Sequence, residues 1–255
     1  MSVKHLGAQL YTVRDFMKTE EDFMETMGKI KEIGYQYVQV SGIGAVSPAC
    51  IKEASEKYNL PVVLTHSNPA RIINDTEAII AEHDLFGCDA IGVGSMGNYT
   101  HDTAGFMKFA EDFCEASKKI KAAGKVLLYH NHGFEFERFD GKLGIDILLG
   151  NTDPDAIKLT FDTFWAQHAG VDPADFIEKH GDRIYVTHLK DMMVKNGAPT
   201  MAEVLNGNMN FDRILEACDK AGIIWHMVEQ DTCPGNPFDS LKMSYDNLTA
   251  RYEFN

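Results

Sequence analysis

The chain has 255 residues, with 38 Asp and Glu against 24 Lys and Arg, and a formal net charge of −14 at pH 7. A chain this acidic is repelled by nucleic acid and by anionic membrane surfaces unless its basic residues gather in one patch. The sequence contains no such run of Lys or Arg, so we expect neither partner. A hydrophobic share of 44% is typical of globular proteins, and no linker divides the chain, so residues 1–255 are predicted to form a single domain.

Two further classes are disfavoured by local patterns. The first residues lack the apolar stretch of a secretory signal, and nowhere do about 18 consecutive apolar residues occur, so we expect a cytoplasmic protein. The five cysteines are scattered and form no CxxC, which favours neither a disulfide framework nor a thiolate zinc site.

Short apolar runs typical of buried strands recur along the chain, and their first residues lie between 26 and 39 residues apart. That spacing leaves room for one helix between neighbouring strands. The predicted strands are His5–Thr12, Tyr35–Val40, Pro61–His66, Asp89–Val93, Val126–Asn131, Lys158–Asp162, Ile184–Leu189 and Ile223–Val228.

The segments between these runs carry helical patterns. In Glu20–Ile33 the apolar residues Phe23, Met27 and Ile30 recur every three or four positions, and Gly34 follows, as is common after a helix. The other predicted helices are Ser47–Tyr58, Asp75–Phe86, Thr103–Ala123, Pro173–His180 and Asn210–Ala221.

Alternating strands and helices predict a parallel sheet, because helices must cover strands that are apolar on both faces. Eight such units in this length predict a (β/α)₈ barrel, also called a TIM barrel. A doubly wound open sheet is the alternative. Its dinucleotide-binding GxGxxG motif is missing after the first strand, and the nearest candidate, Gly92-Val93-Gly94, follows the fourth.

Polar residues at the C-terminal ends of barrel strands form the active site in this fold. The last four predicted strands end in His130 and His132, in Asp162, in His188 and Lys190, and in Glu229 and Gln230. Carboxylates and imidazoles that converge there repel one another or lose solvation unless a cation lies between them. The pattern therefore predicts one divalent metal ion: Mn²⁺ first, with Mg²⁺, Co²⁺ or Zn²⁺ as alternatives.

Five segments together resemble the sugar phosphate isomerase/epimerase family of xylose isomerase-like barrels, which includes tagatose 3-epimerase and inosose dehydratase. The segments are LGAQLYTVRD, YHNHGFEF, FDTFWA, VTHLKD and MVEQD, and the resemblance spans essentially the whole chain. It implies that Asp162, His188 and Glu229 bind the metal. A carboxylate from the fifth strand completes the family's ligand set, but His130 stands at the matching position; we expect Glu135 to be that ligand, with His130 as the alternative.

The remaining site residues are assigned by residue chemistry. His130, His132 and Glu229 are candidate acid–base groups, and Lys190 is a candidate cation for an oxyanion or a substrate phosphate. Candidate contacts to a sugar or polyol are Gln9, Tyr11, His66, Trp165, Lys190 and Gln230.

The resemblance leaves several functions open. The leading hypothesis is an isomerase or epimerase that removes a proton next to the carbonyl of a ketose or keto-sugar. The alternative is a lyase or dehydratase that acts on an inosose or a 3-keto-glycoside from the same site. An enzyme like endonuclease IV and a non-enzymatic sugar-binding barrel are less favoured, and family members are commonly homo-oligomers.

Overall fold

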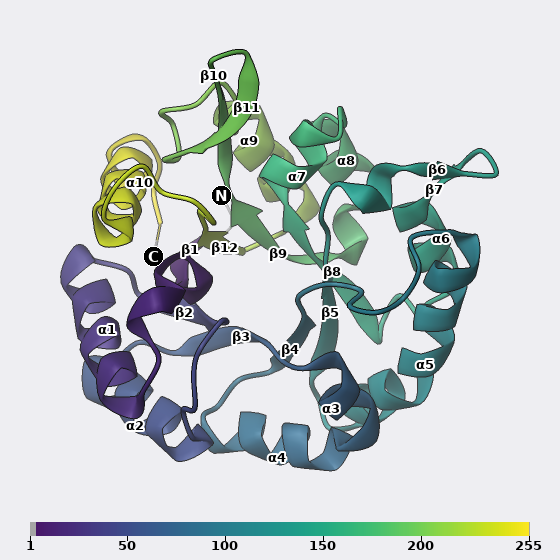
Figure 1. The fold of residues 1–255 in the computed structure, drawn as a ribbon, viewed down its shortest axis with the longest axis horizontal. Coiled ribbons are helices and arrows are strands. Elements are labelled where there is room, and N and C mark those ends of the chain that lie inside the picture. The colour runs from purple at the N-terminus through teal and green to yellow at the C-terminus, as the bar shows by residue number, and fades with distance from the viewer. Residues whose placement is uncertain (1–3, 255) are drawn as a thin grey trace.

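The computed structural model describes residues 4–254 and contains a closed barrel of eight parallel strands (Figure 1). Every neighbouring pair is parallel, and the last strand pairs with the first to close the barrel. In chain order the barrel strands are β1 (His5–Gln9), β2 (Tyr37–Val40), β3 (Val62–His66), β4 (Ala90–Val93), β5 (Val126–His130), β8 (Ile157–Asp162), β9 (Ile184–Leu189) and β12 (Trp225–Val228). The predicted barrel is confirmed.

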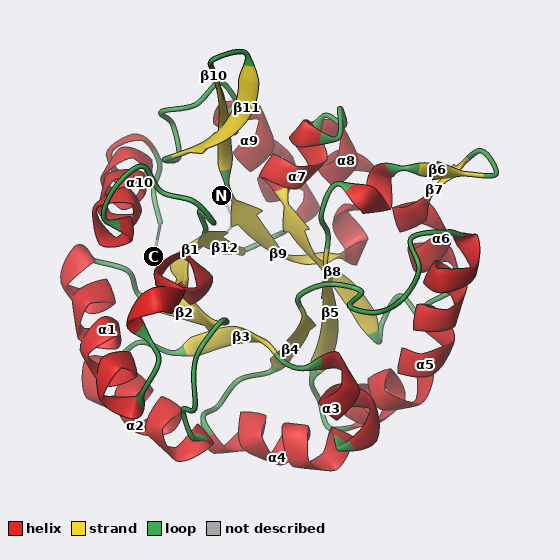
Figure 2. Cartoon of the chain, viewed as in Figure 1, coloured by secondary structure: helices red, strands yellow, loops and turns green. Residues whose placement is uncertain are grey.

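Helices surround the barrel as an outer ring (Figure 2). They are α1 (Glu20–Ile33), α2 (Pro48–Tyr58), α3 (Pro69–Asn74), α4 (Thr76–Leu85), α5 (Thr103–Ala122), α6 (Gly144–Gly150), α7 (Thr163–His168), α8 (Pro173–His180), α9 (Phe211–Ala221) and α10 (Pro237–Arg251). None of the helices in residues 4–254 is long and apolar enough to cross a membrane.

Two apolar layers hold these elements together. A large cluster of buried side chains fills the space between strands and helices. A small second cluster, made of Leu64, Ala90, Leu128, Val186 and Met227, lies apart from it, and all five side chains are completely buried. A Cβ at position 7 in β1 would collide with the Met227 side chain, so only glycine fits there. The barrel interior is therefore a packed core.

The structure departs from the predicted elements in several places. The first strand was expected to reach Thr12, but it ends at Gln9, and a 3₁₀ helix spans Leu10–Phe16. The segment predicted as one helix at 75–86 is preceded by the separate short helix α3. Helices α6, α7 and α10 were not predicted.

Two antiparallel hairpins were also missed. They are β6 (Arg138–Phe139) with β7 (Lys142–Leu143), and β10 (Asp191–Lys195) with β11 (Ala198–Ala202). Figure 1 shows the β10–β11 hairpin projecting beyond the ring of helices. Both follow barrel strands that carry site residues, β5 and β9.

Candidate active site

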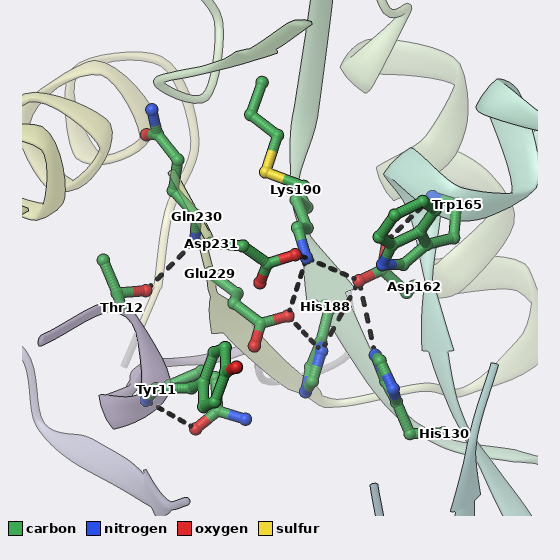
Figure 3. Close-up of polar contacts among 12 residues, drawn as sticks. Tyr11, Thr12, His130, Asp162, Trp165, His188, Lys190, Glu229, Gln230 and Asp231 are labelled. Carbon is green, nitrogen blue, oxygen red and sulfur yellow. Dashed lines mark hydrogen bonds and ion pairs between the residues drawn. The ribbon is translucent and has the colours of Figure 1, made fainter. Parts of the chain in front are cut away.

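Four side chains from four consecutive barrel strands meet at the barrel mouth (Figure 3). They are His130 at the end of β5, Asp162 at the end of β8, His188 in β9 and Glu229 directly after β12. All four are buried, and each offers one ligand atom within 4.8 Å of the others. The parallel register explains this meeting, because Asp162 pairs with His188 and His188 pairs with Met227, two residues before Glu229.

In the imidazoles of His130 and His188, one nitrogen lies within hydrogen-bond distance of an oxygen that can only accept. His130 Nδ1 lies 3.1 Å from the Gly94 carbonyl oxygen, and His188 Nε2 lies 2.7 Å from Gln39 Oε1. Both nitrogens must therefore carry the proton in the neutral ring. The opposite nitrogens are left with lone pairs that face carboxylates.

Those lone pairs are close to carboxylate oxygens. His188 Nδ1 lies 3.0 Å from Glu229 Oε2, and His130 Nε2 lies 3.3 Å from Asp162 Oδ2. Two acceptors at such distances repel each other unless a proton or a metal cation lies between them. Although burial alone would lower it, the carboxylates of Glu229 and Asp162 raise the pKa of His188 to about 9. His188 is therefore protonated at pH 7 when no metal ion is bound, and a metal ion at Nδ1 would replace that proton.

Lys190 lies in the same cluster. Its Nζ is 2.7 Å from Asp231 Oδ2, 3.2 Å from Glu229 Oε2 and 3.4 Å from Asp162 Oδ2. Burial would raise the pKa of Glu229, but Lys190 and then His188 hold it below its ordinary value. Three carboxylates face one ammonium and the proton that His188 holds at its raised pKa, and a divalent cation in place of that proton would balance the remaining negative charge.

The donor set also fits such an ion. Two imidazole nitrogens and two carboxylates are borderline ligands that suit Mn²⁺, Co²⁺ and Zn²⁺ better than Mg²⁺, which prefers oxygen alone. The hydrogen bonds to Gln39 and Gly94 would hold both imidazoles in the ligating tautomer, as partners of metal-bound histidines generally do. The His/Asp/His/Glu group is thus consistent with a divalent metal site.

Glu135, the expected strand-five ligand, lies elsewhere. It belongs to a 3₁₀ turn at Phe134–Phe136, and both of its oxygens are occupied: Oε1 accepts from the Tyr129 hydroxyl and Oε2 accepts from the His132 backbone N–H. Burial raises its pKa to about 8. The structure therefore brings together His130, rather than Glu135, with Asp162, His188 and Glu229.

A cavity of about 540 Å³ opens at the barrel mouth, and two of the four side chains, His130 and Glu229, line it. Most of the predicted substrate-binding and catalytic residues line it: Tyr11, His66, His130, His132, Trp165, Lys190 and Glu229. Two predicted substrate-binding residues, Gln9 and Gln230, are not among the described residues that line the cavity. Gln9 accepts from the Tyr11 backbone N–H, and Gln230 donates to the Thr232 carbonyl oxygen, so both side chains support local turns.

Three groups that hold the site were given no role in the sequence analysis. Gln39 supports His188 from β2, the Gly94 carbonyl supports His130 from the loop after β4, and Asp231 pairs with Lys190. Asp231 follows Glu229 by two residues in the MVEQD segment, which is the signal that could have found it. Gln39 and the Gly94 carbonyl give no comparable signal.

The closed parallel barrel and the buried His/Asp/His/Glu group at its mouth define a TIM-barrel enzyme of the metal-dependent type. The family model of the xylose isomerase-like TIM barrel matches residues 27–237, and the chain belongs to that family.

Comparisons with individual proteins are consistent with this family assignment. An inosose dehydratase of Lacticaseibacillus casei is 25% identical, with 86% of each chain covered. A crystal structure of a sugar phosphate isomerase/epimerase from Parabacteroides distasonis is 26% identical, with a TM-score of 0.81 and coverage of 96% of this chain and 97% of that chain. A second such structure from the same organism shares the fold at 21% identity, with a TM-score of 0.82 and coverage of 98% and 95%.

Proposed function

We propose that the chain is a divalent-metal-dependent enzyme that removes the proton next to the carbonyl of a keto-sugar or ketose. One observation carries this proposal: the buried donor group borders, through His130 and Glu229, a cavity that also presents the neutral imidazole of His132 and the buried ammonium of Lys190. A bound ion would polarise the substrate carbonyl and stabilise negative charge on its oxygen. We propose Mn²⁺, with Co²⁺ and Zn²⁺ as close alternatives.

The chain's own residues supply the proton transfers. Burial lowers the pKa of His132 to about 3, so its ring is neutral at pH 7, and a proton would pass to it only together with charge development on the bound substrate. His130 is engaged with Asp162 and Gly94, which leaves His132 as the imidazole for this role. Lys190 keeps its charge among three carboxylates and is placed to donate a hydrogen bond to a developing oxyanion. Glu229 remains a second proposed acid–base group.

We favour elimination as the outcome, which makes the chain a lyase or dehydratase. Reprotonation on the opposite face, as in an epimerase, is best served by two similar groups on the two sides of the substrate. Here the two sides differ: β5 leads to the imidazole His132, and β12 leads to the carboxylates Glu229 and Asp231. The name of the Lacticaseibacillus casei relative, an inosose dehydratase, supports the same outcome on an inosose, and a 3-keto-glycoside is the other substrate that we propose.

Isomerisation or epimerisation is the second candidate. It is supported by the 26% identical Parabacteroides distasonis structure, which is described as a sugar phosphate isomerase/epimerase. The proton removal is common to both outcomes, so the same residues serve either of them.

Product analysis in deuterated water separates the outcomes. The Mn²⁺-loaded protein is incubated with inososes, methyl 3-keto-glucosides and free ketoses, and the products are followed by proton NMR. Loss of water or of methanol would support elimination. Solvent deuterium in an intact sugar would instead support isomerisation or epimerisation, and the absence of both exchange and turnover across the panel would contradict the proposed proton removal.

A further inference from the structure

A buried histidine outside the metal cluster connects to the cavity through two hydroxyls. His83 in α4 lies behind β3, and its Nε2 is 2.8 Å from Thr65 Oγ1. Thr65 Oγ1 is in turn 2.9 Å from Ser67 Oγ, and Ser67 lines the cavity. His83 and Thr65 are almost completely buried.

The direction of each hydrogen bond between His83, Thr65 and Ser67 follows from the protonation of His83 at the buried end. His83 Nδ1 lies 2.8 Å from the Ile79 carbonyl oxygen, which can only accept, so Nδ1 carries a proton. Burial lowers the pKa of His83 to about 4, so the ring is neutral at pH 7 and Nε2 bears a lone pair. Thr65 must then donate to His83. Since Thr65 has only one proton, Ser67 must donate to Thr65.

We propose that the chain His83–Thr65–Ser67 fixes Ser67 as a hydrogen-bond acceptor in the cavity wall, where it selects a substrate hydroxyl that donates. A serine hydroxyl ordinarily rotates to suit donors and acceptors alike. Here its proton is directed into the protein, so the free lone pairs face the cavity. A ligand group that cannot donate, such as an ether oxygen or a fluorine, finds no partner at Ser67. The polyol class of this ligand rests on the proposed function.

The tautomer of His83 tests the buried end of the chain without any ligand. In the protein labelled with ¹⁵N-histidine, the proposal expects His83 to carry its proton on Nδ1 and a lone pair on Nε2 at pH 7. A proton on Nε2 would reverse the hydrogen bonds and overturn the proposal.

Binding of unreactive polyols tests the end that faces the cavity. The probes are myo-inositol, methyl glucoside and their monodeoxy and monodeoxyfluoro analogues, titrated by calorimetry into the Mn²⁺-loaded protein. A fluorine accepts weakly and cannot donate, so at the ring position that faces Ser67 the fluoro analogue should bind as weakly as the deoxy analogue. Both should bind about five- to tenfold more weakly than the parent, as expected for one hydrogen bond. A fluoro analogue that keeps the parent's affinity at every position would overturn the proposal.

Variants separate this role from a merely structural one. Ser67→Ala should abolish the discrimination between parent and fluoro analogue, and Thr65→Val should reduce it, because the Ser67 proton is then free to donate to the ligand. Thr65→Ser should restore it. Thr160→Val is the matched control, because it also removes a buried threonine hydroxyl, one with no hydrogen-bond partner within residues 4–254. Unchanged discrimination in Ser67→Ala would overturn the proposal.

Failure of the proposed function would look different. If no polyol binds the wild-type protein, the substrate class fails, and with it the hydroxyl assigned to Ser67. The ¹⁵N spectrum still decides the direction of the hydrogen-bond chain in that case, so the two failures are distinguishable.

Discussion

The two halves of the barrel contribute different chemistry to one cavity. The strands β5, β8, β9 and β12 carry the four clustered donors together with Lys190 and Asp231. The strands β1 to β4 and their loops contribute groups that are neutral at pH 7. Burial, followed by His130 and His188, lowers the pKa of His66, so even this imidazole is uncharged. One half thus concentrates charge, and the other presents hydrogen-bonding groups.

The neutral half also orients the charged half. Gln39 in β2 holds the His188 imidazole across the barrel, and the Gly94 carbonyl, just after the neighbouring strand β4, holds the His130 imidazole. The two halves are therefore not independent, because the charged half depends on contacts from the neutral half. Variants on each side measure how strongly the metal affinity depends on each half.

The largest expected effect is the loss of charge at Asp162. Asp162→Asn keeps an oxygen to cap α7 at the Trp165 N–H but removes a negative donor from the cluster. We expect metal content near zero and activity reduced about a thousandfold, equivalent to about 4 kcal/mol of transition-state stabilisation. Elemental analysis and product NMR provide the two measurements.

Asp172→Asn is the control for this variant. Asp172 caps α8 in the same way, through the backbone N–H groups of Ala174 and Asp175, and lies outside the cluster. It should retain both metal and activity. Full metal content in Asp162→Asn would argue against the proposed centre.

Removal of the buried ammonium should affect stability in a metal-dependent manner. Lys190→Met removes the ammonium shared by Asp162, Glu229 and Asp231, and such a loss typically costs about 3–5 kcal/mol. A bound divalent ion would compensate part of that charge. Thermal unfolding should therefore show a larger loss with chelator than with saturating Mn²⁺.

Lys125→Met provides the comparison for Lys190. Lys125 is equally a buried lysine, paired with Asp84 and Asp89, both outside the donor cluster. Lys125→Met should lower the stability by the same amount with chelator and with saturating Mn²⁺. If Lys190→Met behaved in the same way, the ammonium and the ion would not share the carboxylates.

The strand-five donor is tested by two variants that should differ. His130→Ala removes a nitrogen from the cluster, and we expect metal affinity to fall on the order of 100-fold. Glu135→Gln should leave metal affinity within about threefold, because Glu135 is held by Tyr129 and His132 instead. Competition with a fluorescent chelator measures both, and the opposite ranking would restore Glu135 as the ligand.

The smallest expected effect comes from the neutral half. Gln39→Leu removes the acceptor that fixes the His188 tautomer, and such supporting contacts typically contribute about tenfold or more to metal affinity. Gln9→Leu is the matched control, because Gln9 is an equally buried glutamine whose amide oxygen bonds only locally, to the Tyr11 N–H. Equal affinities in the two variants would confine the metal site to the second half.

Much of the barrel was predictable because buried parallel strands are short apolar runs at regular intervals. The missed elements depend on tertiary contacts. Leu10 and Val13 continue the apolar pattern of β1, yet they form a 3₁₀ helix whose first turn is capped by the Gln9 side chain. The β10–β11 hairpin is held by Asp191, which accepts from the backbone N–H groups of Met192, Leu205, Gly207 and Met209. Such contacts leave no periodic pattern in the sequence, so they cannot be predicted from it.

The site was predictable only where a residue ends a strand. Asp162 and His188 belong to strands β8 and β9, Glu229 directly follows β12, and the direction of each side chain follows from strand geometry. Glu135 and Gln230 lie beyond the strand ends, where a turn rather than a strand sets the direction of the side chain. The contact of Gln39 with His188 joins strands that are not neighbours and forms only when the barrel closes, whereas the Gly94 carbonyl is a backbone group, which the residue type does not reveal.

The contiguity of the donor strands has a consequence for recombination. Because all four donors come from one continuous stretch between His130 and Glu229, a chimaera could exchange the segment from β1 to β4 for that of another barrel and retain every side chain of the His/Asp/His/Glu group. The exchanged segment would need to supply an amide oxygen at position 39 and a carbonyl at position 94. Within those two constraints, the cavity wall around Ser67 is free to diverge, and new substrates become accessible without rebuilding the reactive centre.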